Sequence, residues 1–219
     1  MKAFVITIEG HEDSERVASR CISSGKRFDL DIQTWKATTP ADNVVALAEE
    51  RNLPLGNFIE RYSRSNNCVA AFLSHYSLWE ECIRLNEPVV ILEHDAIMHG
   101  PVAQSVSAQY GPVCTNLGQP SYGAYRTPDT LGINRLTSKA YFPGAHAYLV
   151  NPEGARLLIS LAKVHACPTD LYLNLKVFDW LTEYYPWVAE ARDTFSTIQN
   201  FVGCKAKHGY NSDYTLSDV

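Results

Sequence analysis

Three consecutive residues that could bind a metal or move a proton follow an apolar segment near the middle of the chain. Residues 88–92, PVVIL, have the composition of a buried strand, and Glu93, His94 and Asp95 come directly after them. Side chains at the carboxyl end of a buried parallel strand lie where open α/β sheets bind their ligands. Two carboxylates one residue apart suit a hard divalent cation, which takes oxygen ligands and keeps positions for phosphate oxygens. The pattern predicts a site for Mn²⁺ or Mg²⁺ beside a phosphorylated ligand.

Such a site would favour group transfer from a nucleoside diphosphate. This leaving group departs readily once its developing charge is neutralised, and a metal between carboxylate and diphosphate does so as a Lewis acid. On spacing alone, a solvated acidic turn is an equal alternative. His94 leaves three readings open: a metal ligand, a hydrogen-bond donor to a ribose or phosphate oxygen, or the mark of a degraded site. As a ligand, its imidazole would shift the preference towards Zn²⁺ or Mn²⁺ and away from Mg²⁺.

Strand and helix patterns alternate along the chain, as in an α/β domain. Residues 3–8 form a largely apolar, β-branched run, which is typical of a strand covered on both faces. From Val17 to Ile22 apolar residues recur at helical spacing, and Gly25 is a stop signal. The further predicted elements are a strand over 28–35, a helix over 43–51, a helix from Val69, a strand over 145–150 and a helix from Pro152 behind an Asn151 cap. Residues 100–140 are rich in Gly, Pro, Ser, Thr and Tyr and predict long functional loops.

The composition narrows the classes of partner and location. With 219 residues, 46% of them apolar and no visible linker, we expect one domain over residues 1–219. A formal net charge of −5 gives no basic footprint for nucleic acid. The N-terminal apolar run is too short for a signal peptide or a membrane span, and no later stretch is long enough to span. Six cysteines without a CxxC pair predict reduced thiols in a soluble, cytoplasmic protein.

Four ordered motifs resemble glycosyltransferase family 25. The segment with LSHYSLW, followed by the strand ending in LEHD, resembles the family's helix with LSH-x-x-x-W and its strand ending in LEDD. The matching residues are Leu73, Ser74, His75, Trp79, Leu92, Glu93 and Asp95. The segments FVITIEGHEDSER, GAHAYLVNPEGARLLIS with its P-x-D ending, and FSTIQ are similar to further segments of the family. His94 departs from the usual Asp, and Ala70 and Ala71 stand where a Gly-Cys element is usual.

The resemblance implies a GT-A type nucleotide-sugar-binding domain with a mostly parallel central sheet flanked by helices. It implies a metal-dependent hexosyltransferase that moves galactose or glucose from a UDP-sugar to a hydroxyl acceptor, with inversion. Glu93, His94 and Asp95 would hold the Mn²⁺ or Mg²⁺. The residues expected to contact the donor are Thr7, Glu9, Arg16, Ser74 and His75, the last two with structural hydrogen bonding as the alternative. Asp170, in the P-x-D ending, would be the base that takes the acceptor's proton, with a role at or beside the metal, or simple helix termination, as the alternatives.

Several alternatives stay open at this point. The acceptor could be a glycan of lipooligosaccharide type, a hydroxylysine-like side chain or another hydroxyl. His94 motivates a second hypothesis, a nucleotide-sugar-binding pseudoenzyme. The basic and aromatic residues between Tyr122 and Phe142 motivate a third, a transferase acting on a modified nucleobase in DNA. In the tail, residues 203–210 carry basic side chains that either fold over the diphosphate or stay solvated.

Overall fold

The computed structural model of the protein describes residues 1–59, 64–120, 123–192 and 197–198. The strands are β1 (Lys2–Thr7), β2 (Ile32–Lys36), β3 (Val89–Glu93), β4 (Ala96–Met98), β5 (Cys114–Asn116), β6 (Gly132–Arg135), β7 (Ala147–Val150), β8 (Thr182–Tyr185) and β9 (Ala189–Ala191). The α-helices are α1 (Glu12–Lys26), α2 (Val44–Glu50), α3 (Ser65–Leu85), α4 (Gln104–Ser107), α5 (Pro152–His165) and α6 (Thr169–Tyr172). Short 3₁₀ helices are η1 (Pro40–Asp42), η2 (Gly56–Phe58) and η3 (Pro143–Ala145).

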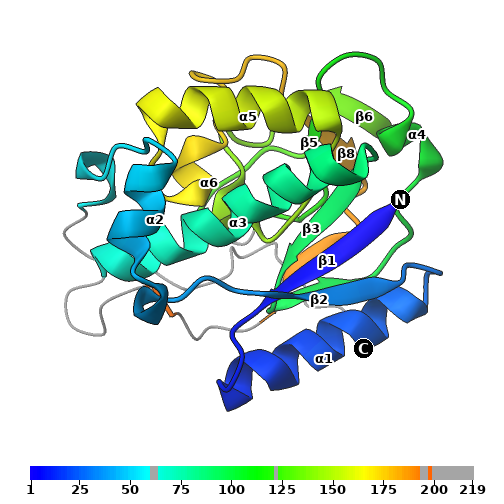
Figure 1. Cartoon of the computed structure of the whole chain (residues 1–219). Coiled ribbons are helices and arrows are strands. Elements are labelled where there is room, and N and C mark those ends of the chain that lie inside the picture. The colour runs from blue at the N-terminus through cyan, green and yellow to red at the C-terminus, as the bar shows by residue number, and fades with distance from the viewer. Residues whose placement is uncertain (60–63, 121–122, 193–196, 199–219) are drawn as a thin grey trace.

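A seven-stranded sheet in the order β2-β1-β3-β7-β5-β8-β6 forms the centre of the fold. Strands β2, β1, β3, β5 and β8 run in one direction, while β7 and β6 run in the other. Helix α1 lies on one side of the sheet, and α2, α3, α5 and α6 lie on the other (Figure 1). Strands β4 and β9 form a separate two-stranded sheet. The predicted α/β fold with a mostly parallel central sheet flanked by helices is confirmed.

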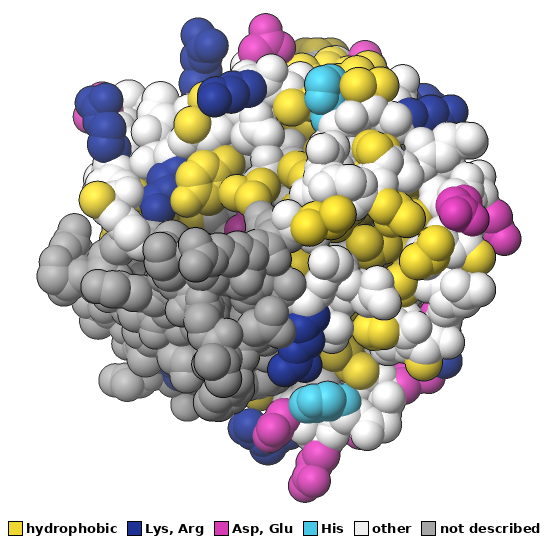
Figure 2. Space-filling model, turned by 90° about the vertical axis from the view of Figure 1, so that its left-hand side faces the viewer, with side chains coloured by type: hydrophobic (Ala, Val, Ile, Leu, Met, Phe, Trp, Pro, Cys, Tyr) yellow, Lys and Arg dark blue, Asp and Glu magenta, His cyan; other side chains and the backbone are white. Residues whose placement is uncertain are grey.

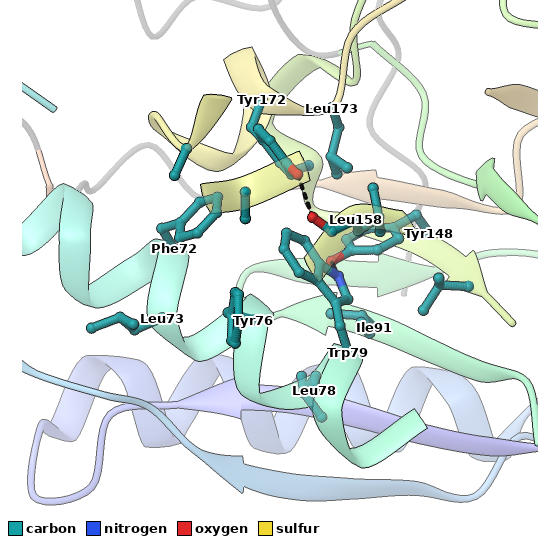
Figure 3. Close-up of a cluster of buried hydrophobic side chains, with 14 of the residues drawn as sticks. Phe72, Leu73, Tyr76, Leu78, Trp79, Ile91, Tyr148, Leu158, Tyr172 and Leu173 are labelled. Atoms are coloured by element: carbon teal, nitrogen blue, oxygen red, sulfur yellow. Dashed lines mark hydrogen bonds between the residues drawn. The ribbon is translucent and has the colours of Figure 1, made fainter. Parts of the chain in front are cut away.

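Apolar residues fill both sides of the sheet. On the α3 side, Phe72, Trp79 and Tyr172 pack edge to face or tilted, with ring centroids 5.3–5.8 Å apart (Figure 3). Trp79 is completely buried and belongs to the core. On the α1 side, a second cluster joins α1 to β1, β3 and the β4–β9 sheet. The sheet is therefore covered on both faces, which explains why its central strands are apolar throughout.

Some elements differ from those predicted. Residues 28–30 form a turn rather than the start of a strand, because Asp29 has a φ of 56° and Phe28 N–H donates to the carbonyl of Gly25. The strand begins only at Ile32. The expected loops at 100–140 contain α4, β5 and β6. These elements span only three or four residues each, so they carry too little periodicity to be recognised and depend on pairing with distant strands.

One face of the molecule exposes many hydrophobic side chains (Figure 2). It lies on the side where α2 and α6 stand in Figure 1, and exposed residues of the elements at that side include Val45 in α2, Val164 in α5 and Leu171 in α6. In the described ranges, no helix is both long and apolar enough to cross a bilayer.

We predict that Gly154→Ala destabilises the fold. Gly154 lies in the first turn of α5, where a Cβ would meet the carbonyl oxygen of Val113 at 2.3 Å. Val113 cannot retreat easily, because its backbone N–H and carbonyl both hydrogen bond to the helix cap Asn151. The forced shift should cost about 1–3 kcal/mol of the free energy of unfolding, measured by urea denaturation.

Gly56→Ala is the matched control, since a Cβ there would meet no atom within 4 Å. Its free energy of unfolding should stay within about 0.5 kcal/mol of the parent value. Equal stability of the two variants would contradict the packing of α5 against the segment before β5.

Candidate active site

The Glu93–His94–Asp95 turn lies at the carboxyl edge of the central sheet. Glu93 is the last residue of β3, and the next two residues form the turn that leads into β4. Backbone hydrogen bonds hold the turn from both sides: Glu93 N–H donates to the carbonyl of His146 at 2.9 Å, and Arg192 N–H donates to the carbonyl of Asp95 at 3.1 Å. This is the edge at which open α/β sheets bind ligands.

A buried chain of hydrogen bonds runs from α3 to Glu93. Trp79 Nε1–H donates to the Tyr148 hydroxyl at 2.9 Å, and this hydroxyl lies 2.9 Å from His75 Nδ1. His75 Nε2 in turn lies 3.2 Å from Glu93 Oε1. Figure 3 shows the indole of Trp79 beside the Tyr148 ring. The His75 and Tyr148 rings are stacked, with their planes 19° apart.

Which group donates and which accepts in each of these hydrogen bonds follows from the number of protons on each group. Because Tyr148 accepts from Trp79, its own proton is available for His75 Nδ1. With Nδ1 accepting, Nε2 carries the ring proton and donates to the Glu93 carboxylate. Burial acts to raise the pKa of Glu93, but its hydrogen bond with His75 and the electrostatic effect of the neighbouring histidines outweigh burial and hold the pKa below its usual value. The chain therefore presents Glu93 as an oriented carboxylate.

Other side chains of α3 fix the segment that follows β2. Thr38 N–H donates to Ser74 Oγ at 2.9 Å, and Trp35 Nε1–H donates to Ser77 Oγ at 3.0 Å. The side chains of Ser74 and His75 are each only 1% exposed. Both make the structural hydrogen bonds that were one alternative for them. Contact of Ser74 and His75 with the nucleotide-sugar donor stays a prediction. Because both side chains are buried, that contact would be indirect, through Thr38 and Glu93.

The first strand leads to a groove beside α1. The groove has a volume of about 460 Å³ and is lined by Thr7, Glu9, Glu15, Ser19, Thr34 and Lys36, among others. Thr7 is buried at the end of β1, whereas the Glu9 side chain is 63% exposed and forms an ion pair with Lys36 at 2.9 Å. Arg16 is exposed and pairs with Asp13 at 3.1 Å. Of the predicted nucleotide contacts, Thr7 and Glu9 thus line one groove, and Arg16 is not among its lining residues.

Ser14 connects this region to the Glu93–His94–Asp95 turn, and no sequence pattern singles it out. It is the third residue of α1 and is completely buried. Its Oγ accepts from Ile8 N–H at 2.9 Å and lies 2.7 Å from His94 Nδ1. The loop after β1 and the turn after β3 therefore share one hydroxyl group.

The carboxylates of the turn are of the type that could hold a divalent cation shared with a ligand. Within the described ranges, no group of three or more His, Cys, Asp or Glu side chains is arranged to hold a metal by itself. Mg²⁺ is commonly bound through one or two carboxylates together with substrate phosphates. Glu93, held by His75, and Asp95, within the turn, carry carboxylate oxygens of this kind.

Asp170 lies on a different element from the Glu93–His94–Asp95 turn, the short helix α6. It is half-buried in α6, which packs against η3, and η3 leads directly into His146 and β7. Its Oδ1 accepts from Leu171 N–H at 3.0 Å. The basic tail residues Lys205, Lys207 and His208, and the aromatic Tyr122, lie outside the described residues.

The remaining histidines differ in their surroundings. His165 is exposed, as expected of a surface residue. His146 is 2% exposed, and burial lowers its pKa to about 4, with the Glu93 carboxylate opposing. Its ring occupies the space above Gly118, where a Cβ would lie 2.2 Å from Nε2. Burial also lowers the pKa of His99. Both rings are therefore neutral at physiological pH.

Glu183 is a buried carboxylate that no sequence pattern singles out, and it orders part of the long loops. Glu183 on β8 is completely buried, and its Oε1 accepts from Thr137 N–H at 2.6 Å and Ser138 N–H at 2.8 Å. An isolated Glu in a short strand carries no motif, so only the contacts reveal this role. The loop that precedes η3 is thereby fixed to the sheet.

We predict that Tyr148→Phe lowers stability markedly. The change would leave Trp79 Nε1–H and His75 Nδ1 without their shared partner in the core. Loss of a partner for buried polar groups costs about 1–3 kcal/mol, which guanidinium denaturation can measure. Tyr76→Phe is the matched control, because the Tyr76 hydroxyl makes no hydrogen bond within the described part of the chain, and a nearly neutral effect is expected there. Equal effects of the two changes would argue against the hydrogen-bonded chain.

A comparison with known protein families identifies the family of the chain. The model of glycosyltransferase family 25 (LPS biosynthesis protein) matches residues 1–112, just over half of the 219 residues. A search of curated proteins found no match. Among solved structures, the CTP:phosphocholine cytidylyltransferase LicC from Streptococcus pneumoniae is 12% identical, with a TM-score of 0.37, over 86% of this chain and 91% of that one. The matched residues include the β1–α1 loop, the α3 motif and the Glu93–His94–Asp95 turn, and the chain belongs to glycosyltransferase family 25.

Proposed function

We propose that this glycosyltransferase moves a hexose, galactose or glucose, from a UDP-sugar to a hydroxyl acceptor, with a divalent cation and with inversion. The observation that carries the proposal is the meeting of the β1–α1 loop and the β3–β4 turn through Ser14 and His94 at the carboxyl edge of the sheet. Two segments of the matched region thus border one place that has an adjoining groove and two carboxylates.

The donor would lie across this edge in two parts. The groove beside α1 carries Glu9 and Glu15 with Lys36, a lining that suits the hydroxyl and amide groups of a nucleoside better than a diphosphate. The diphosphate would lie at the turn, where Glu93 and Asp95 would hold Mn²⁺ or Mg²⁺. When bound, the cation neutralises charge on the leaving diphosphate. His75 keeps Glu93 ionised and oriented for this task.

Transfer with inversion needs one base on the acceptor side. The acceptor oxygen attacks the anomeric carbon as the bond from that carbon to the diphosphate oxygen breaks, and UDP leaves with the electron pair. Asp170 would take the proton of the acceptor hydroxyl. Its support is the packing of α6 against η3, which leads into His146 and so to Glu93. The acceptor would be a glycan or another hydroxyl compound.

We predict that Mn²⁺ and UDP together raise the melting temperature by more than the sum of their separate effects. Each supplies ligands or charge that the other lacks, and a ligand that binds only the folded state raises apparent stability. Thermal shifts with Mn²⁺ alone, UDP alone and both, with Ca²⁺ and CMP as comparison ligands, measure this. Purely additive shifts would count against a shared site for metal and diphosphate.

We predict that Asp95→Asn and Asp170→Asn fail in different ways. Loss of a metal-binding carboxylate should weaken donor binding and turnover together. Loss of a base should lower turnover by roughly 10²–10⁴-fold and leave donor affinity nearly unchanged. Calorimetric UDP-sugar affinity in Mn²⁺, beside turnover at saturating acceptor, separates the two outcomes.

Asp31→Asn, an exposed change at the opposite edge of the sheet, is the matched control and should alter neither quantity. Unchanged donor affinity in the Asp95 variant would contradict the assignment of Asp95 as a metal ligand. Full turnover in the Asp170 variant would contradict the assignment of Asp170 as the base. Tight donor binding without any turnover in the parent protein would favour the nucleotide-sugar-binding pseudoenzyme.

A further inference from the structure

The segment directly after β5, residues 117–119, is bonded to both of the segments that hold the turn after β3. The first holds the turn through the carbonyl of His146, which accepts from Glu93 N–H at 2.9 Å. The second holds it through Arg192 N–H, which donates to the carbonyl of Asp95 at 3.1 Å. His146 directly precedes β7, and Arg192 directly follows β9. The position of the turn therefore depends on how these two segments are placed relative to each other.

Backbone hydrogen bonds join the segment after β5 to each of them. Leu117 N–H donates to the carbonyl of Ala147, the first residue of β7, at 3.0 Å. Gln119 N–H donates to the carbonyl of Ala189, the first residue of β9, at 2.8 Å. Gly118 lies between these two hydrogen-bonded residues. A displacement of its backbone would therefore shift both segments, and the turn with them.

Gly118 has no room for a side chain. A Cβ at this position would lie 2.2 Å from Nε2 of His146 and 2.8 Å from Cδ2 and Cε1 of the same ring, far inside van der Waals contact. The His146 residue is only 2% exposed, so its ring would have to move into packed surroundings rather than into solvent. Gly118 does not have the positive φ of Gly111 or Gly132. Glycine is therefore required here for space and not for backbone conformation.

We propose that Gly118 is a positioning residue for the carboxylates of the turn. Its missing side chain lets the His146 ring pack directly on residues 117–119, and this contact sets the two backbone groups at the separation that holds Glu93 and Asp95. The role of these two carboxylates at the cation rests on the proposed function, whereas the contact itself belongs to the fold. His146 holds the turn with a backbone carbonyl that any residue can provide, so the demand falls on position 118.

Gly118→Ala tests the contact without any substrate. The added Cβ must displace the His146 ring or residues 117–119, and the hydrogen bonds to the turn should then open more often. Amide hydrogen exchange of the full chain, followed by NMR at Glu93 and Arg192, measures this opening. We expect exchange at both amides to be faster by roughly ten-fold or more than in the parent protein. Unchanged exchange at both amides in a folded variant would show that the ring moves aside without disturbing the turn, and the proposal would be wrong.

Gly154→Ala is the matched control for a general loss of stability. It introduces a clash of similar size between the same two strands at their other ends, because a Cβ at Gly154, just after β7, would lie 2.3 Å from the carbonyl oxygen of Val113, just before β5. This variant should lower the melting temperature but leave exchange at Glu93 and Arg192 within about three-fold of the parent value. Equally fast exchange in both variants would assign the effect to stability alone and contradict the proposal.

Removal of the His146 ring should cancel the effect of the added Cβ, because the three atoms nearest to that Cβ all belong to this ring. UDP affinity in Mn²⁺, measured by calorimetry, should fall by roughly ten-fold or more from the parent protein to G118A, as is typical when the support of a metal ligand is lost. From H146A to the double variant G118A/H146A it should change by less than about three-fold. An equal loss in the two comparisons would show that the ring is not the partner of Gly118 and would contradict the proposal.

The exchange measurement separates a failure of this proposal from a failure of the proposed function. If the parent protein binds no UDP in Mn²⁺, the proposed donor is wrong, while exchange at Glu93 and Arg192 still tests the role of Gly118. If G118A does not fold, the double variant decides: a folded G118A/H146A with the amide protection of H146A supports the contact between Gly118 and the ring, and an unfolded double variant beside a folded H146A overturns it.

Discussion

The hydrogen bond between His75 and Glu93 is the constraint on which the site depends. A histidine that is 1% exposed needs partners for both ring nitrogens, and it finds them in Tyr148 on one side and Glu93 on the other. This double requirement fixes α3 against the ends of β3 and β7 at once. Ser74, one residue before, then meets the segment after β2. The serine and histidine of the family motif are therefore explained by what they hold in place.

The hydrogen bond between His75 and Glu93 fixes the position of the turn after β3. Ser14 connects this turn to the neighbouring loop between β1 and α1. Glu93 is oriented from the core, while His94, the next residue, is oriented from α1. Successive side chains of the turn are thus held by opposite faces of the sheet. Support from both faces of the sheet holds these side chains rigidly, as binding a ligand in a fixed geometry requires.

The central strands and long helices could be predicted from the sequence, because their apolar periodicity is strong. Glu93 and Asp95 could be found too, since a buried strand that ends in carboxylates is a local pattern. Ser14, Tyr148 and Glu183 could not, because each acts through a partner 46–80 residues away. The short strands β4 to β6 were missed for a related physical reason: their stability comes from pairing with β9, β7 and β8 rather than from their own residues.

The family match ends at residue 112, yet three contacts that fix the turn come from beyond it. Two of them, from His146 and Arg192 to the turn, use backbone atoms only, so they place no demand on side chains at those positions. The third comes from the Tyr148 hydroxyl, which acts on the turn through His75, so it does depend on the side chain at position 148. The second half of the chain can therefore change its loops while a few pairings keep the turn in place. Under the proposed function, this division of contacts would let the choice of acceptor vary on a constant donor-binding scaffold.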